Sequence, residues 1–410
     1  MAVFRRNDQL TLCLTIVFLS AQLQPVHAAV NGLEEIGHSW QADMRGGTEV
    51  AVGDTALSQV RQPASVVLHS KVRFDSKLTN IFPVNKFNGP LEGDVYRVPD
   101  KPNFALAVVG PINKSSGWGF SVFSKTSWDS AFRGKFLLRN KIESARGSVL
   151  NYAAQLNAGH RLTEKLSVGG GGRVELMKTG SSAVFGPAKM DLGGEWSVGG
   201  GFNLGALYQV RKNTILGFGY RSPTWLGPSG RGVIDLTDGR RFQARVPLTR
   251  NVLPQRVMLG VSCRPTDKIM LACEGTWVNY QYSLFGKTKV RSALPLEFPA
   301  QMKDILIAGV GCDYELTKNW GISGGYTFNT NPVARSDVMP TFGSNTQNTL
   351  SCGLRYKRDR WWAGVAYDLG LPNWTRNNDP RHIPRLGVDY GHATLKNMMQ
   401  SVTYGVGCFL

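Results

Sequence analysis

Apolar and polar residues alternate with a period of two over most of the chain. In the last ten residues, Val402, Tyr404, Val406, Cys408 and Leu410 share one face, while small or polar residues occupy the other. The same pattern predicts about fourteen strands, at 64–74, 103–110, 116–126, 148–162, 165–177, 193–210, 214–222, 255–264, 268–282, 305–317, 320–329, 349–358, 360–370 and 401–410. Because a closed barrel pairs every sheet edge, we expect an all-β fold built as one barrel.

The connections between the predicted strands alternate strictly between short and long. The short ones are polar and lie at 113–116, 162–165, 211–213, 265–268, 317–319 and 358–360. The long ones lie at 75–102, 127–147, 178–192, 223–254, 283–304, 330–348 and 371–400. Transmembrane antiparallel β-barrels of the bacterial outer membrane have an even number of strands, short periplasmic turns and long outer loops. The alternation therefore predicts such a barrel in a Gram-negative bacterium, with both termini on the periplasmic side.

Each predicted strand has one face suited to lipid. Over 196–210 the outward face carries residues such as Phe202 and Leu204, whereas the inward face is small or polar. Aromatic residues near strand ends suit the membrane interfaces, namely Tyr208, Trp277, Tyr314, Trp320, Tyr356, Trp361 and Tyr367. The cysteines at 263, 273, 312, 352 and 408 all fall on the outward phase. We expect them to be small apolar side chains facing lipid, and not disulfides or metal ligands.

The first 28 residues have the features of a cleaved signal peptide. Arg5 and Arg6 precede an apolar stretch at 10–19, and Val-His-Ala at 26–28 suits a cleavage site after Ala28. The segment has two arginines and Asp8 and thus a net charge of +1, so its removal lowers the formal net charge from +18 to +17. This charge suggests contact with anionic lipid or lipopolysaccharide, although solvated loop charges without a partner would account for it equally well.

Motifs for catalysis, nucleotides or metals are missing from the sequence. There is no P-loop, no complete G-x-G-x-x-G, no G-x-S-x-G, no H-E-x-x-H and no paired C-x-x-C. The glycine-rich stretch at 168–173 lacks phosphate-loop spacing, and the histidines are widely scattered. We therefore expect no enzymatic activity, no cofactor and no metal site, while noting that spatial neighbours at a barrel rim need not be sequence neighbours.

Four stretches resemble one known family. They are MRGGTEVAVGDTALSQVRQPASVV, LGFGYRSPTWL, PQRVMLGVSCRPTDKIMLACEGTWVNYQYS and TLSCGLRYKRDRWWAGVAYDLGL, and their order and spacing cover nearly the whole chain after residue 28. They resemble the FadL/TodX family of outer-membrane transporters for long-chain fatty acids and other hydrophobic compounds. The resemblance implies an N-terminal hatch at 29–62 that plugs a transmembrane barrel at 63–410.

The resemblance also implies a gate. The hatch of the family ends in Asn-Pro-Ala, and the matching residues here are Gln62, Pro63 and Ala64. Lateral release through a kinked third strand is implied as well, and glycines in that predicted strand permit a bulge. The expected hatch and gate residues are Arg45, Gly46, Gly47, Asp54, Gln62, Pro63, Ala64, Gly117 and Gly119.

Two candidate ligand sites follow from the needs of an amphipathic acid, which are an apolar surface for the tail and a cation for the head. The long connection 127–147 is the candidate capture loop, with Trp128, Phe132, Phe136, Leu137 and Ile142 as binding residues. A buried helical hairpin is the competing structural interpretation of this loop. Inside the barrel, Arg173 and Arg221 are the candidate headgroup contacts. The inward phase also holds Arg355, Glu175, Glu195, Glu274 and Asp313.

The sequence thus predicts a monomeric outer-membrane channel that takes up a hydrophobic small molecule, with a fatty acid as the expected substrate, by passive diffusion without chemical change. The expected partners are this small molecule and outer-membrane lipid or lipopolysaccharide, and not nucleic acid. A general water-filled porin and a loop-borne adhesin are the alternatives, because both use the same barrel without a plug. A soluble nucleic-acid-binding β protein would rest on the basic charge alone.

Overall fold

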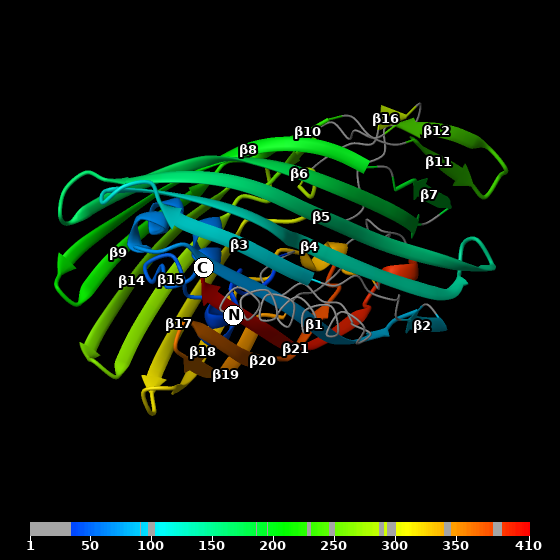
Figure 1. The fold of residues 1–410 in the computed structure, drawn as a ribbon. Helices are drawn as coiled ribbons and strands as arrows, with labels where there is room; N and C mark the ends of the chain where they lie inside the picture. Colours follow the sequence, from blue (N-terminus) through cyan, green and yellow to red (C-terminus); the bar gives the residue numbers. More distant parts are fainter. Residues whose placement is uncertain are drawn as a thin grey trace, which may run out of the picture.

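The computed structural model describes residues 34–90, 92–96, 103–185, 187–194, 196–227, 231–245, 251–286, 291–292, 301–339, 346–379 and 388–410. The expected signal peptide lies outside these residues. Fourteen long antiparallel strands form a closed barrel, because β1 pairs with β21 as well as with β3 (Figure 1). None of the helices in the described ranges is long or apolar enough to cross a membrane.

The fourteen strands of the wall follow one another in chain order around the barrel. They are β1 (Arg73–Asn88), β3 (Asn103–Pro111), β4 (Ser116–Phe136), β5 (Lys141–Arg161), β6 (Leu166–Phe185), β8 (Trp196–Arg211), β9 (Thr214–Arg221), β14 (Arg256–Thr266), β15 (Ile269–Val278), β17 (Ile305–Glu315), β18 (Trp320–Asn329), β19 (Asn348–Arg358), β20 (Trp361–Arg376) and β21 (Thr394–Phe409). The predicted transmembrane antiparallel barrel of about fourteen strands is confirmed.

Seven short strands extend the sheet within the long connections. They are β2 (Glu92–Tyr96), β7 (Ala188–Leu192), β10 (Thr224–Leu226), β11 (Arg231–Leu236), β12 (Arg241–Arg245), β13 (Val252–Leu253) and β16 (Arg291–Ser292). In Figure 1, β2, β7, β11, β12 and β16 gather at the end of the barrel opposite the short turns. We call this the upper end, and the end with the short turns the lower end.

The alternation of side chains through the wall agrees with the predicted faces. In β8, Val198 is 61% exposed on the outer face, whereas its inward neighbour Ser197 is 6% exposed. The cysteines are free, and Cys273 and Cys352 are exposed as expected. Cys408 is buried, although it lies on the outward phase.

Residues 34–72, which we call the inner segment, fill the lower half of the lumen. Their helices are α2 (Trp40–Met44), η1 (Ala56–Val60) and η2 (Pro63–Leu68), and η2 contacts β3, β4, β5, β6 and β8. The prediction of a first strand at 64–74 was therefore wrong for residues 64–72, and β1 instead continues to Asn88 through the predicted connection. Proline has no N–H for a strand ladder but suits the first turn of a helix. The chain accordingly forms η2 at Pro63, and β1 begins ten residues later, at Arg73.

The predicted long connection at 127–147 was also wrong, because β4 and β5 continue through it as one hairpin with a turn at 137–140. Each strand has 21 residues and spans roughly 70 Å, more than twice the ~30 Å hydrocarbon core of a membrane. Beyond the membrane the outer face meets water, so Arg133 and Lys135 are exposed while Phe132 and Phe136 point inward. The lipid-type alternation is lost there, although the strands continue.

Candidate functional site

The upper lumen is lined by a large apolar cluster, which we call the upper apolar cluster. It consists of Val149, Met177, Ala183, Ala188, Met190, Leu192, Ile234, Leu253, Val278, Tyr280, Leu284, Phe285, Met302, Ile305 and Ile307. Methionine side chains are unbranched and adapt to differently shaped partners. Three of them in one cluster give the upper lumen a surface that can repack around apolar molecules.

The predicted capture residues are divided between two surroundings. Phe132 and Phe136 are fully buried and meet edge to face, with ring centroids 6.1 Å apart. They form a second apolar cluster with Tyr390, Phe87 and others at the upper end. The structure does not bring Leu137 and Ile142 into this cluster, since they are 50% and 66% exposed. The side chain of Trp128 lies outside the described part.

Below the upper apolar cluster lies a buried group of charges, which we call the central charge cluster. It consists of four cations and two carboxylates, namely Lys125, Arg173, Arg221, Arg256, Glu34 and Glu175. All six side chains are at most 5% exposed. The two clusters adjoin, because Val278 lies directly opposite Arg256 and Met177 follows Glu175 on the same inward face of β6.

The two predicted headgroup contacts, Arg173 and Arg221, both belong to this cluster but have different partners. Arg173 pairs with Glu175 and donates to Asn203 Oδ1 and, at 2.9 Å, to Thr224 Oγ1. Arg221 donates to Glu34 Oε2 of the inner segment at 2.9 Å. Arg173 is thus held by the wall, whereas the partner of Arg221 comes from the inner segment.

Arg221 lies directly opposite Arg256 on the neighbouring strand. Like charges in such a pair repel each other, and the Glu34 carboxylate relieves the repulsion because it contacts both guanidinium groups, at 2.9 and 3.2 Å. The Nε atoms of Arg221 and Arg256 are buried and donate no hydrogen bond to any described residue. The pair therefore keeps unused donors that suit a second carboxylate.

Sequence reasoning missed three members of the cluster. Lys125 reaches the lumen because a register shift between Ser124 and Thr126 interrupts the alternation of β4. Its Nζ then donates to Glu175 at 2.9 and 3.1 Å. The inward phase of Arg256 could be read from β14, but Glu34 lies in the predicted hatch, where no strand pattern indicates the direction of a side chain. Of the other inward charges, Arg355 pairs with Glu315, and the side chain of Glu195 is outside the described part.

The predicted bulge at Gly117 and Gly119 was wrong. The irregularity of β4 lies at Lys125, and both glycines instead face the inner segment. A Cβ atom at Gly117 would lie 2.5 Å from the carbonyl oxygen of Val66, and one at Gly119 would lie 2.2 Å from Gln59 Oε1. These glycines therefore allow the inner segment to pack closely against β4.

The predicted hatch residues hold the inner segment to the wall. Arg45 is fully buried and donates to Asp54 at 2.7 and 3.0 Å and to Asp313 of β17 at 2.9 Å. Burial alone would raise the pKa of Asp54, but the Arg45 guanidinium outweighs it and leaves the pKa below its ordinary value. Gly46 and Gly47 follow with φ of 61° and 80°, which favours glycine.

Gln62 anchors the start of η2, at the position for which the sequence resemblance implies an asparagine. Its Nε2 lies 3.0 Å from the carbonyl oxygen of Ala206 in β8 and 2.9 Å from that of Phe218 in β9. Its Oε1 accepts from the Ala64 N–H at 3.3 Å, so the side chain also caps the helix that Pro63 begins. The longer amide thus connects two wall strands to the inner segment.

Glu49 occupies a buried site where the inner segment meets β15. Its carboxylate accepts from the His38 N–H at 3.2 Å and lies 3.7 Å from Arg61. Burial, opposed by Arg61 and reinforced by Glu274, raises the pKa of Glu49 from 4.5 to about 7. Burial also lowers the pKa of His38 well below 6.5, so this histidine is neutral.

Docking of the inner segment is expected to weaken as the pH rises from 6.5 to 8. The pKa of Glu49 is higher in the docked segment than in a free one. Its contribution to docking is therefore fully present below pH 4.5 and is lost as the pH rises through 7. Glu49 alone contributes roughly 1 kcal/mol over this window. His38 opposes the trend in the lower part of the window, because a free histidine is still partly protonated near pH 6.5. The measurement is the frequency of single-channel openings at the two pH values. Glu49→Gln should reduce the dependence, and an unchanged dependence would contradict the assignment.

The apolar outer wall, the filled lumen and the closed sheet define a transmembrane barrel of the outer-membrane transport class. A family model described as outer membrane protein transport protein (OMPP1/FadL/TodX) matches residues 46–371. The chain belongs to this family, which confirms the resemblance seen in the sequence. The family consists of transport channels of the bacterial outer membrane and not of enzymes.

Solved structures of similar fold come from several bacteria. The Pseudomonas putida toluene transporter TodX matches with a TM-score of 0.73 at 14% identity, over 92% of this chain and 99% of that one. The Ralstonia pickettii toluene transporter TbuX matches with 0.67 at 16% identity, over 92% and 99%. A Pseudomonas aeruginosa FadL homologue matches with 0.69 at 13% identity, over the same shares. A comparison with curated proteins gives no match.

Proposed function

We propose that this protein takes up amphipathic hydrophobic acids, with long-chain fatty acids as the favoured substrates, by binding and passive diffusion. The observation that carries the proposal is the contact between the upper apolar cluster and the central charge cluster, in which four cations face two carboxylates. An acyl chain needs the apolar surface of the upper apolar cluster, and its carboxylate needs the cations of the central charge cluster. A neutral hydrocarbon would use only the upper apolar cluster.

The unused donors of the arginine pair support a headgroup site at Arg221 and Arg256. Glu34 holds this position in the structure, so an entering carboxylate competes with it for the same guanidinium groups. The proposed route begins at the upper end, where Phe132 and Phe136 line the lumen, and continues down to this pair. In this scheme the inner segment acts as the hatch that closes the barrel below.

Exit through the wall beside β4 fits the strand pairing. The register of β4 with β5 shifts between Ser124 and Thr126. The bulge at Lys125 falls between these two positions and twists the strand locally. We place the lateral opening there, eight residues beyond the Gly117 position suggested by the sequence.

The test compares a fatty acid with its methyl ester in ligand-binding measurements on Arg221→Gln and Arg256→Gln. Both variants should weaken binding of the acid about tenfold or more and leave the ester nearly unchanged, because only the acid offers a charge to the lost guanidinium. Arg358→Gln is the matched control, since that side chain is 74% exposed at the lower end. Equal losses for acid and ester would show that these arginines are structural and would refute the headgroup site.

A further inference from the structure

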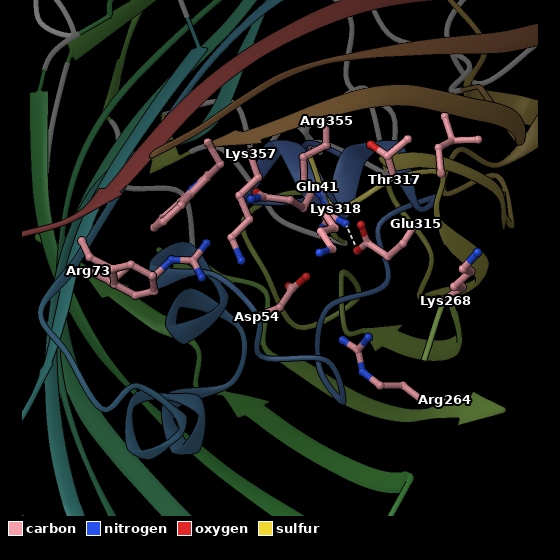
Figure 2. Close-up of a pocket in the computed structure, with 13 residues that line it drawn as sticks. Gln41, Asp54, Arg73, Arg264, Lys268, Glu315, Thr317, Lys318, Arg355 and Lys357 are labelled. Carbon is pink, nitrogen blue, oxygen red and sulfur yellow. Dashed lines mark hydrogen bonds and ion pairs between the residues drawn. The ribbon is translucent and has the colours of Figure 1, made fainter. Parts of the chain in front are cut away.

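A separate pocket opens at the lower end of the barrel, below the inner segment. It has a volume of about 640 Å³ and is lined by Gln41 and Asp54 of the inner segment, by the lower ends of several strands and by two turns. Figure 2 shows Arg73, Arg264 and Lys357 reaching toward the space around Asp54 from different elements. None of its lining residues belongs to the central charge cluster, and the fully buried Arg45 lies behind Asp54.

The charges around this lower pocket are unbalanced. Its lining contains six cations and two carboxylates, and both carboxylates have arginine partners, Asp54 with Arg45 and Glu315 with Arg355. Arg73 pairs with Asp75 and stacks over the Trp362 ring at 4.2 Å. The other four cations, Arg264, Lys268, Lys318 and Lys357, form no ion pair with any described residue. A concave surface with such an excess concentrates anions.

Two further features indicate an organic ligand. Trp362, Phe409 and Leu316 add an apolar wall to the cationic one. The volume lies within the ~300–1,000 Å³ that is usual for small-molecule sites.

We propose that the lower pocket binds small amphipathic carboxylates from the periplasmic side. The carboxylate would meet Arg264, Lys318 and Lys357, and the apolar part would lie against Phe409 and Leu316. The inference extends the proposed function, because an acid that has crossed the membrane barrier would meet this pocket on the far side of the inner segment. The pocket is open at the lower end, so an acid added on that side reaches this second site without passing the central charge cluster.

The experiment is calorimetric titration of the full mature chain in lipid nanodiscs with octanoate, octanol and inorganic phosphate. Arg264→Gln/Lys318→Gln/Lys357→Gln should weaken one class of octanoate site about tenfold or more, with a parallel loss of its salt dependence. The matched control, Lys165→Gln/Arg211→Gln/Lys212→Gln, removes the same charge from short turns that do not line the pocket, and should behave as the parent does. Octanol should bind without responding to either change.

Unchanged octanoate sites in the first triple variant would overturn the proposal. Phosphate competing as well as octanoate itself would also overturn it, because the apolar wall would then have no role. Arg221→Gln separates this inference from the proposed function. If only Arg221→Gln removes an octanoate site, the proposed function is supported and the proposed site in the lower pocket is refuted. If only the triple variant loses a site, the lower pocket is supported and the headgroup site of the proposed function is refuted.

Discussion

Replacing Arg45 by alanine is expected to raise the open probability of the barrel about a hundredfold. Arg45 is fully buried and is the shared partner of Asp54 and Asp313. Removing one member of a buried ion pair leaves unpaired charges and costs about 3–5 kcal/mol, and about 3 kcal/mol corresponds to a hundredfold change in population. The ladders of the wall are untouched, so the loss falls on docking of the inner segment. The measurement is single-channel conductance in planar bilayers.

The control for this variant is Arg358→Ala, in which an exposed arginine at the same end is lost. It should keep the low conductance expected of the parent, because its contact with Asp359, at 3.9 Å, is exposed and worth little. If Arg45→Ala also kept the parental conductance, the buried ion pairs would not hold the inner segment in place. A large and stable current from the parent itself would favour a general porin.

Replacing Gly405 by valine is expected to expel Trp40 from the wall while the barrel stays closed. A Cβ atom at Gly405 would lie 1.8 Å from Trp40 Cδ1, and the rigid indole has no way to yield within the docked segment. Trp40 is fully buried, and loss of such a side chain from its packing costs about 3–5 kcal/mol. Valine itself suits a strand. Protease digestion should therefore cut the inner segment of this variant far faster than that of the parent.

Gly275→Val is the matched control, because Gly275 is exposed on the outer face and a Cβ atom there would meet nothing within 4 Å. This variant should resist the protease as the parent does. Heat-modifiable mobility on gels checks that both barrels are folded. An inner segment that stays protected in Gly405→Val would show that Trp40 contributes little to docking.

The wall of the barrel was largely predictable from particular residues. Phe202 and Asn203 show why, since lipid requires an apolar side chain on one face and the lumen accepts a polar one on the other. Because this requirement applies to each strand separately, each strand shows the alternation within its own residues. The inward phase of Arg173 and Arg221 followed from the same rule. The signal weakened at Phe132 and Phe136, where the strands leave the membrane and the outer face becomes charged.

The contents of the lumen were not predictable in the same way. The bulge that turns Lys125 inward breaks the period of two, and no turn residue in the sequence indicates its position. Glu34 joins the central charge cluster from the predicted hatch, outside every predicted strand. The lower pocket combines residues from the inner segment, six strands and two turns, and their side chains converge only when the barrel closes.

By itself the sequence determined the barrel, its faces, its approximate strand number, its family and the inward direction of its arginines, because burial in lipid constrains each strand through local alternation. Only the tertiary structure decided what those arginines contact, how the inner segment is held and where β4 is irregular. These features depend on pairs such as Arg45 and Asp313, which are 268 residues apart. Nothing local in the sequence specifies such a pairing, since it results from the fit of one folded segment inside a closed wall.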